Sequence, residues 1–352
     1  MRTGRTRTAL WGCVAVAALT LSGCFSGPSP KPKPTVTGPD WLSVRTTKEL
    51  PDITIERVAY RSGDLTIQGQ ICRPTVDGRH PVLIFNHGGF GGIGDRDDPN
   101  GFCASFAKTG WVVAESSYRG EDGSDGRVEV CLGEVDDVLA MIGVVRGQSY
   151  ADPTRVAMIG LSHGGCVTSK ALERGADVDL AVDVAGPSDW SSLIRSVKRS
   201  IRAPETNPVL RNIQQSMVST VEKAVGGSVS RYPRRYAKRS PDPEKLARWG
   251  KPLLIMHGAA DSIVPVAQSC ELAAEIGNFQ PYRFDTSGVV VSEPPPGCKG
   301  ITWQDGPSPI DTFKADRYLL TYDDVDHFLV PDSGFVQMTT AFTKFLEIKL
   351  PR

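Results

Sequence analysis

The sequence lacks features that several classes of protein require. Beyond residue 21, no apolar run is long enough to cross a bilayer as a helix. No two cysteines have the Cys-x-x-Cys spacing of zinc and redox motifs, and no internal repeat is evident. The formal net charge is zero, which argues against a nucleic-acid partner. No metal and no organic cofactor is implied.

The start of the chain has the pattern of an export signal. Three arginines precede an apolar stretch over 9–21, which is too short for a permanent membrane helix. The stretch ends in Leu-Ser-Gly-Cys, which resembles the lipobox of bacterial lipoproteins. We therefore predict a signal peptide over 1–23 and an acylated Cys24 that anchors the protein to membrane lipid on the extracytoplasmic side of the cell membrane. An ordinary cleaved signal with an incidental cysteine is the alternative.

Two further segments follow the predicted signal peptide. Residues 24–44 are rich in proline and have no apolar period, so they predict an extended tether. Residues 45–352 predict a single domain, because apolar residues make up 40% of the chain and suffice for one core.

The cysteines after Cys24 are even in number, which suggests disulfides in an exported chain. They are Cys72, Cys103, Cys131, Cys166, Cys270 and Cys298. The pairs Cys103–Cys131 and Cys270–Cys298 are plausible, because each would pin an irregular segment. The spacing alone does not fix the pairing.

Short apolar runs alternate with helical patterns along the domain. The runs at 53–60 and 65–72, separated by Arg-Ser-Gly-Asp, predict an N-terminal antiparallel hairpin. Continuously apolar runs predict buried strands at 82–85, 111–114, 156–159, 180–184, 253–256 and 318–322. Helices are expected at 133–146, 164–174, 267–276 and 335–348. The alternation predicts an α/β fold with a doubly wound, mostly parallel sheet.

Residues 188–250 interrupt this alternation. They carry 13 Lys and Arg against 5 Asp and Glu and contain several amphipathic stretches. Their position between two predicted strands favours a helical cap inserted over the active site. The positive charge is either a solvated surface or, given the predicted anchor, a contact with anionic lipid head groups.

The most informative motif is Gly-Leu-Ser-His-Gly at 160–164. It follows a predicted strand and precedes a predicted helix, which is the setting of a nucleophile elbow. Glycines flank the serine because so sharp a turn crowds any neighbouring side chain. Ser162 is therefore the candidate nucleophile.

A serine nucleophile needs a base, and the base needs an orienting acid. In sheet-based hydrolases these follow the serine in the order acid, then histidine. Asp261 follows the strand predicted at 253–256, and His327 follows the strand at 318–322. The aspartates within 323–326 are rival acids that we expect to shape the His327 loop instead.

The loop that follows the strand at 82–85 reads Asn-His-Gly-Gly-Phe-Gly-Gly. Its glycines allow backbone N–H groups to approach a substrate, as an oxyanion hole requires. We expect the N–H of His163 to act together with a donor from Gly88, Gly89 or Phe90. A phosphate-binding loop is the alternative, but the Lys and Ser/Thr of a P-loop are missing.

Other polar residues near these motifs have mainly structural interpretations. Arg119 is expected to anchor its loop through a carboxylate such as Glu121 or Asp122, and contact with the substrate is the alternative. His87 and His257 are expected to be structural histidines at strand ends. The aspartates within 95–98 are either solvated loop charges or the anchor of a substrate amine.

Together these motifs resemble the α/β-hydrolase fold, nearest to its dienelactone-hydrolase and prolyl-oligopeptidase-like branches. The matching pieces are His-Gly-Gly at 87–89, Ser-Tyr-Arg-Gly at 117–120, the serine motif at 160–165, residues 252–265 and Asp-His at 326–327. The resemblance implies that Ser162 is the nucleophile, Asp261 the acid and His327 the base. The sequence departs from both branches at 287–309, a Pro/Gly-rich insertion of undefined role.

The resemblance implies a serine hydrolase acting on a small ester or peptide. We favour a carboxylesterase acting through an acyl-enzyme at the cell surface, because the sequence carries no pattern of a gating propeller domain. A peptidase of prolyl-oligopeptidase-like type, either an aminopeptidase or an oligopeptidase, and acyl transfer to an envelope acceptor are alternatives. The alternative from another class is a non-catalytic ligand-binding lipoprotein. The sequence does not define the oligomeric state.

Overall fold

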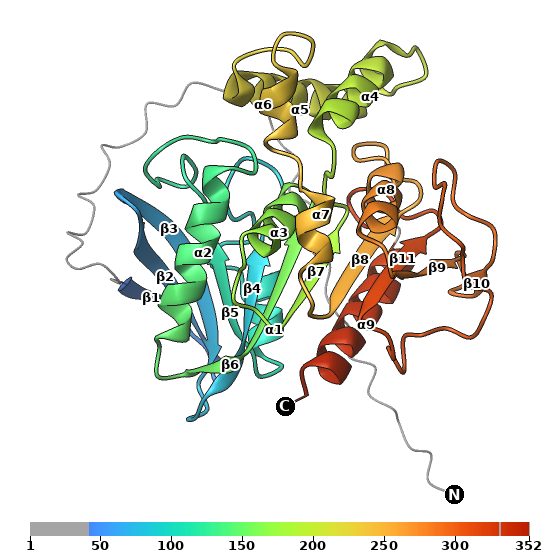
Figure 1. Ribbon diagram of the computed structural model, residues 1–352. Helices are drawn as coiled ribbons and strands as arrows, with labels where there is room; N and C mark the ends of the chain where they lie inside the picture. The colour runs from blue at the N-terminus through green and yellow to red at the C-terminus, as the bar shows by residue number, and fades with distance from the viewer. Residues whose placement is uncertain (1–41, 331, 352) are drawn as a thin grey trace, which may run out of the picture.

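The computed structural model describes residues 42–330 and 332–351 of the chain (Figure 1). The predicted signal peptide, Cys24 and most of the predicted tether lie outside these residues. In the described ranges, no helix is long and apolar enough to cross a membrane.

The described strands form one eleven-stranded sheet. They are β1 (Leu42–Glu49), β2 (Ile53–Ser62), β3 (Leu65–Pro74), β4 (His80–Asn86), β5 (Val112–Ser116), β6 (Ala151–Leu161), β7 (Leu180–Val184), β8 (Leu253–Gly258), β9 (Gln280–Phe284), β10 (Val290–Val291) and β11 (Arg317–Tyr322). Their order across the sheet is β1-β2-β3-β5-β4-β6-β7-β8-β11-β9-β10.

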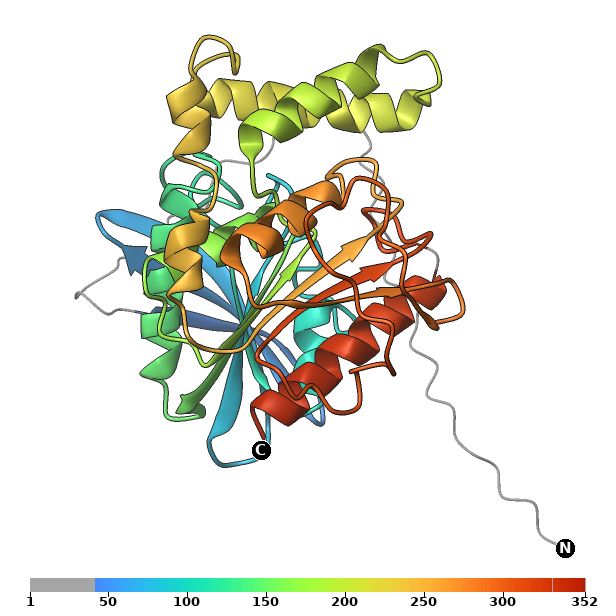
Figure 2. The same ribbon diagram turned by 45° about the vertical axis from the view of Figure 1, so that its right-hand side comes forward.

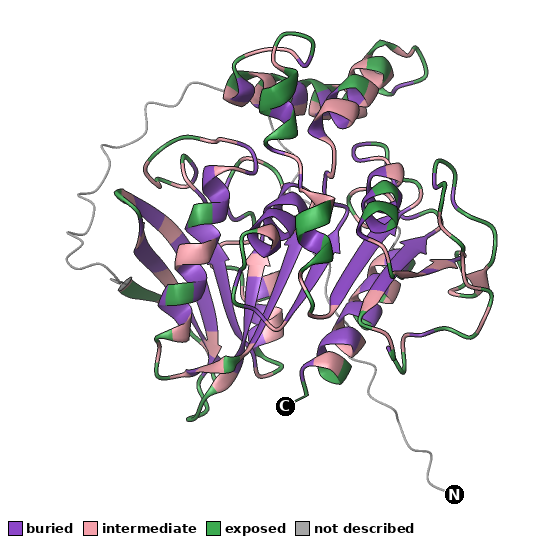
Figure 3. Cartoon of the chain, in the orientation of Figure 1, coloured by how far each residue is buried: buried purple, intermediate pink, exposed green. Residues whose placement is uncertain are grey.

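The centre of the sheet is parallel, from β5 to β9, and its first three strands are antiparallel. All residues of β5, β7 and β8 are buried, as expected for strands covered on both faces (Figure 3). The predicted hairpin is confirmed as β2 and β3. Strand β1 begins at Leu42, before the domain boundary predicted at residue 45.

Helices cover both faces of the sheet (Figures 1 and 2). They are α1 (Phe102–Ala107), α2 (Gly133–Arg146), α3 (His163–Glu173), α4 (Trp190–Arg202), α5 (Pro208–Val225), α6 (Pro233–Ala237), α7 (Pro243–Ala247), α8 (Ala267–Ile276) and α9 (Asp332–Lys349). One apolar cluster joins the sheet to α2, α3 and α8, and a second joins it to α1 and α9. The predicted doubly wound α/β fold is thus confirmed.

Three disulfides are present in the described residues. They are Cys72–Cys103, Cys131–Cys166 and Cys270–Cys298. The prediction for Cys270 and Cys298 is confirmed, whereas a bond between Cys103 and Cys131 is wrong. These two cysteines belong to the apolar clusters on opposite faces of the sheet, so the sheet separates them.

Helices α4, α5 and α6 lie above the edge at which the parallel strands end (Figures 1 and 2). Local sequence explains their ends. Asn207 caps α5 by accepting a hydrogen bond from the Leu210 N–H, Pro208 occupies the first turn, and Gly226 ends the helix with a left-handed backbone. The fully buried Gln214 of α5 donates its side-chain N–H to the Ser262 carbonyl, which joins this layer to the loop after β8.

Candidate active site

Ser162 lies in the turn between β6 and α3. Its backbone is strained, with φ of 55° and ψ of −121°, as a nucleophile elbow requires. The flanking glycines are needed sterically. A Cβ at Gly160 would lie 2.0 Å from the Gly164 carbonyl oxygen, and one at Gly164 would lie 1.9 Å from the Asn86 carbonyl oxygen. The elbow therefore presents the serine hydroxyl above the strand ends.

The structure brings the three predicted residues into one hydrogen-bonded chain. His327 Nε2 lies 2.9 Å from Ser162 Oγ, and His327 Nδ1 lies 2.6 Å from Asp261 Oδ2. The Asp261 side chain is fully buried, and that of His327 is 10% exposed. Each residue comes from a loop that follows a parallel strand, so the common direction of the strands places all three at one edge of the sheet.

Asp261 is held in one orientation by its own loop. Its Oδ1 accepts hydrogen bonds from the N–H groups of Ile263 and Val264, at 2.9 and 2.8 Å, which leaves Oδ2 for His327. Burial alone would raise the pKa of Asp261. The charge of His327 and the hydrogen bonds from His257 and His327 outweigh burial and lower that pKa well below its usual range. The acid is therefore ionised at any neutral pH.

The predicted oxyanion loop lies against the nucleophile. A Cβ at Gly88 would be 3.0 Å from the Leu161 carbonyl oxygen and 3.2 Å from Ser162 Cβ, so the loop packs closely against the nucleophile and any side chain here would crowd it. Gly89 has a φ of 74°, in the left-handed region. His163 is the first residue of α3, and its N–H therefore has no acceptor within the helix. The structure thus places the predicted donor residues around Ser162.

The sequence profile of the prolyl oligopeptidase family matches residues 102–283, which include the serine elbow and Asp261. The chain belongs to the prolyl oligopeptidase family. It is accordingly a serine hydrolase.

Individual relatives include both peptidases and esterases. The uncharacterized peptidase YtmA of Bacillus subtilis is 23% identical over 218 residues, which cover 62% of this chain and 77% of YtmA. Pyrococcus horikoshii acylaminoacyl peptidase superposes with a TM-score of 0.59 at 19% identity, over 86% of this chain and 43% of that protein. Acetyl xylan esterase 1 from Thermoanaerobacterium superposes with a TM-score of 0.55 at 14% identity, over 86% of this chain and 88% of the esterase. The chain thus spans less than half of the archaeal peptidase, and both structural similarities support the fold alone.

The aspartates near His327 stabilise its loop, which agrees with the expectation from the sequence. Asp326 Oδ1 accepts hydrogen bonds from the N–H groups of Phe328 and Val330, at 2.8 and 3.1 Å. Asp323 forms a paired contact with Arg283, in which both nitrogen–oxygen distances are 2.8 Å. The loop that carries the base is therefore fixed from both sides.

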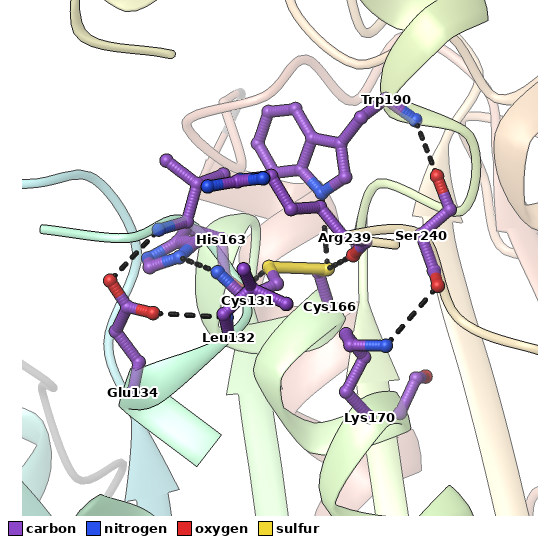
Figure 4. The surroundings of a disulfide bond; sticks show 12 residues. Cys131, Leu132, Glu134, His163, Cys166, Lys170, Trp190, Arg239 and Ser240 are labelled. Atoms are coloured by element: carbon purple, nitrogen blue, oxygen red, sulfur yellow. Dashed lines mark hydrogen bonds between the residues drawn. A yellow bond between two sulfur atoms is a disulfide. The ribbon is translucent and has the colours of Figure 1, made fainter. Parts of the chain in front are cut away.

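The side chain of His163 packs between the Cys131 loop and the oxyanion loop. The ring is 2% exposed, and its Nε2 accepts a hydrogen bond from the Cys131 N–H at 3.2 Å (Figure 4). Its centroid is 4.7 Å from the Phe90 ring of the oxyanion loop. Burial lowers its pKa to about 3, against a smaller opposing effect of the Gly89 backbone, so the ring is neutral. Cys131 precedes His163 by 32 residues, and no local motif signals the contact.

Arg119 has a structural role, as expected, but with another partner. It binds the fully buried Asp137 of α2 through Nε at 3.0 Å and Nη2 at 2.8 Å. The predicted partners are wrong, because Glu121 accepts the Gly92 N–H and Asp122 accepts the Ile93 N–H. Burial raises the pKa of Glu121 to about 8.

The disulfide Cys131–Cys166 joins the loop that contacts His163 to helix α3, four residues after the nucleophile (Figure 4). We expect the C131A/C166A variant to lose about 3 to 4 kcal/mol of unfolding free energy, because the bond restricts the unfolded chain. We also expect kcat to fall by about 10- to 100-fold, because the oxyanion loop shifts with His163. Urea unfolding and ester kinetics measure the two effects.

The C270A/C298A variant is the matched control. Its bond closes a loop of similar length, 28 residues against 35, but it joins α8 to the 287–309 segment, and neither of these carries the nucleophile or an oxyanion residue. It should lose comparable stability and keep kcat at a temperature where both variants are folded. An equal loss of kcat in both variants would contradict a specific role of Cys131–Cys166 at the site.

Proposed function

We propose that this serine hydrolase cleaves a carboxylic ester through an acyl-enzyme on Ser162. The observation that supports the proposal best is the continuous hydrogen-bonded chain from Ser162 Oγ through His327 to the buried Asp261. His327 takes the serine proton as Ser162 attacks the carbonyl carbon, and then protonates the departing alcohol. Water activated by His327 releases the acyl group.

Backbone N–H groups stabilise the charge that develops on the substrate oxygen. The N–H of His163 provides one donor, and the loop of Gly88, Gly89 and Phe90 provides the second. Each such donor is worth about 3 to 4 kcal/mol in the transition state. Because glycines and helix geometry fix these groups before the substrate arrives, little reorganisation is needed.

The acidic loop after the oxyanion residues supports an ester rather than a peptide with a free amine. Asp97 pairs with Arg57, Asp95 accepts the N–H of Phe102, and Asp98 accepts the N–H of Asn100. An amino-terminal substrate would have to compete with these partners. Phe328 and Val330, 42% and 48% exposed beside His327, suit an apolar acyl or alcohol group.

A peptidase is the second candidate, because YtmA carries the name of a peptidase. The two functions are separated by pairs of substrates that share one acyl group and differ only in an ester or amide bond. Turnover of esters alone, lost in S162A, supports the ester proposal. Efficient cleavage of the amides, with or without a free amino terminus, would replace it with the peptidase.

We further propose that the enzyme is exported as a lipoprotein and acts at the membrane surface. The lipobox pattern at 21–24 supports this proposal. Replacing Cys24 by alanine tests it: the protein should move from the membrane fraction to the soluble fraction of the producing cells. Retention of the variant on membranes would exclude acylated Cys24 as the anchor.

The outer face of α4 fits an anionic lipid surface. Its exposed residues are Arg195, Arg199 and Arg202, and within the described part of the chain none of them forms an ion pair. Replacing all three by glutamine should weaken binding of the soluble protein, residues 25–352, to vesicles containing phosphatidylglycerol by about 100-fold, at about 1 kcal/mol per charge. Vesicle co-sedimentation at several salt concentrations measures the effect.

The control variant R146Q/R155Q/R174Q removes the same charge from arginines that pair with carboxylates. It should bind these vesicles as the wild type does, and vesicles of phosphatidylcholine alone should bind neither protein. Equal weakening by both variants would show a general charge effect and contradict a lipid contact through α4.

A further inference from the structure

A buried acidic side chain lies against both ends of the oxyanion loop. Glu121 Oε2 accepts the N–H of Gly92, where the glycine-rich part of the loop ends. The same oxygen lies 3.8 Å from Nε2 of His87, where the loop begins. The side chain of Glu121 is 1% exposed and that of His87 is 6% exposed. Residues 88–90, to which we assign the second oxyanion donor, lie between these two contacts.

The loop that carries Glu121 packs tightly against the oxyanion loop. Tyr118 stacks on His87 with 4.2 Å between ring centroids, and its hydroxyl donates to the His87 carbonyl at 3.3 Å. Gly92 has a φ of 87°, and a Cβ there would lie 2.1 Å from Asp122 Oδ2. A shift of the loop that carries Glu121 must therefore move the oxyanion loop as well.

The hydrogen bond of His87 shows which of its nitrogens carries a proton. Nδ1 lies 3.0 Å from the Gly88 carbonyl oxygen, which can only accept, so Nδ1 is the donor. In a neutral ring Nε2 is then an acceptor that faces Glu121. In the described part of the chain, neither His87 Nε2 nor Glu121 Oε1 has a hydrogen-bond partner. An ionised Glu121 would oppose this lone pair, whereas a protonated Glu121 can direct its O–H toward it. At 3.8 Å the attraction is weaker than a full hydrogen bond.

Two arrangements place one proton between these side chains. Either Glu121 is a neutral acid beside a neutral His87, or the proton lies on the ring and the two side chains form an ion pair. Burial favours the neutral pair, because two charges would lose their hydration. Burial lowers the pKa of His87 to about 4, against a smaller opposing effect of the Gly88 carbonyl. It raises the pKa of Glu121 to about 8, against the opposing hydrogen bond from the Gly92 N–H.

The other charged groups nearby do not offset a negative charge on Glu121. Arg96 and Arg119 each pair with another carboxylate, at 3.0 and 2.8 Å. The charges of Glu134 and Asp122 raise the pKa of Glu121 further. The titratable groups on the segments packed around Glu121 are His87, Arg96, Tyr118, Arg119, Asp122, Glu134, Asp137 and His163. Loss of the proton therefore leaves an uncompensated charge behind the oxyanion loop.

We propose that Glu121 is a positioning residue that holds the oxyanion loop as a neutral carboxylic acid, and that loss of its proton in alkaline solution loosens the loop and lowers turnover. The inference rests on the proposed function, because the loop acts only if its N–H groups stabilise a substrate oxyanion. Contact between Glu121 and the substrate is not required. Since the loop acts in the transition state, its displacement should lower kcat more than it changes KM.

The variants E121Q and E121A test the proposal by ester kinetics across pH. The glutamine amide can accept the Gly92 N–H and donate toward His87 as the protonated acid does, but it cannot ionise. At about pH 7, E121A should lose about 10- to 100-fold in kcat with little change in KM, and E121Q should restore kcat to within about threefold of the wild type. Wild-type kcat/KM should decline around pH 8, where Glu121 ionises, and E121Q should lack this decline.

The E115Q variant is the matched control. Glu115 of β5 is also a buried acid whose pKa is raised by burial, but it accepts its hydrogen bond from Gln70 of β3, at 3.0 Å. E115Q should keep kcat, KM and the alkaline decline. An alkaline decline that E121Q retains, or that E115Q also removes, would overturn the proposal. Equal losses of kcat in E121Q and E121A at neutral pH would overturn it as well.

Thermal unfolding across pH needs no turnover, so it separates failure of this inference from failure of the proposed function. The pKa of Glu121 is raised from 4.5 to about 8. Stability from such a group is fully present below about pH 4.5 and is lost as the pH rises toward 8. The Tm of the wild type should therefore fall relative to that of E121Q between about pH 5 and 8 and then level off. A constant difference would show that Glu121 is ionised throughout and would overturn the proposal. If the difference changes as expected but no ester is cleaved, the proposed function fails and the neutral acid stands.

Discussion

Replacing Ser162 by alanine is expected to reduce kcat/KM for an ester by about 10⁶-fold, the scale found when a serine protease loses its nucleophile. The reason is geometric. Ser162 Oγ is the atom that lies 2.9 Å from His327 Nε2, and the strained elbow offers no second hydroxyl at that point. The alanine side chain is tolerated by the same backbone, so folding should be preserved.

Covalent labelling with a fluorophosphonate probe, together with ester kinetics, measures this effect. The S219A variant, which alters an exposed serine of α5, is the control and should label as the wild type does. Labelling of S162A would exclude Ser162 as the nucleophile. If folded wild type is neither labelled nor active but binds ligands, a non-catalytic binding lipoprotein becomes the better description.

Replacing Asp261 by asparagine is expected to lower kcat by about 10⁴-fold. Oδ1 already accepts the N–H groups of Ile263 and Val264, so the asparagine oxygen must take that place. The amide nitrogen then faces His327 Nδ1, and two donors oppose each other. The ring of His327 is forced into the tautomer protonated on Nε2, which cannot accept the proton of Ser162.

Asp326 offers a control of the same chemistry. It lies next to His327 in the sequence and also accepts two backbone N–H groups through one oxygen, which asparagine can reproduce. D326N should therefore keep kcat within about threefold, the size of an ordinary surface change of under 1 kcal/mol. Nitrogen-15 shifts of His327 report the tautomer directly. An active D261N with the wild-type tautomer would show that another carboxylate orients the base.

The central strands of the sheet could be predicted because strands covered on both faces are apolar throughout. Residues 180–184 and 253–256 are fully buried in β7 and β8, as their sequences indicate. The edge strands could not be predicted in this way. The sequence of β1, Leu-Ser-Val-Arg-Thr-Thr-Lys-Glu, is polar because this strand pairs only with β2 and is largely exposed. Pairing with a neighbour, rather than a local pattern, makes it a strand.

The residues of the candidate site likewise fall into those that local sequence predicts and those that depend on tertiary packing. Ser162, Asp261 and His327 could be predicted because turn chemistry and the order of the chain locate them after strands. The contacts of the His163 ring with Cys131, and of His257 with Ser269, depend on which helix packs against which strand. The partner of Arg119 and the disulfide of Cys103 were misassigned for this reason, since the sequence does not state on which face of the sheet a loop lies.

The helical layer above the site has a consequence for how the enzyme admits substrate. Gln214 holds α5 to Ser262, the residue after Asp261, and Arg239 donates to the Glu129 carbonyl in the loop that leads to Cys131. Lifting this layer would leave buried donors unpaired, at about 1 to 3 kcal/mol each. It would also release the loops that brace the acid and the oxyanion residues. Opening of this helical layer would therefore displace catalytic residues and stop turnover. Substrate that entered through such an opening would meet an inactive site, so we expect substrate to enter from the side while the layer stays closed.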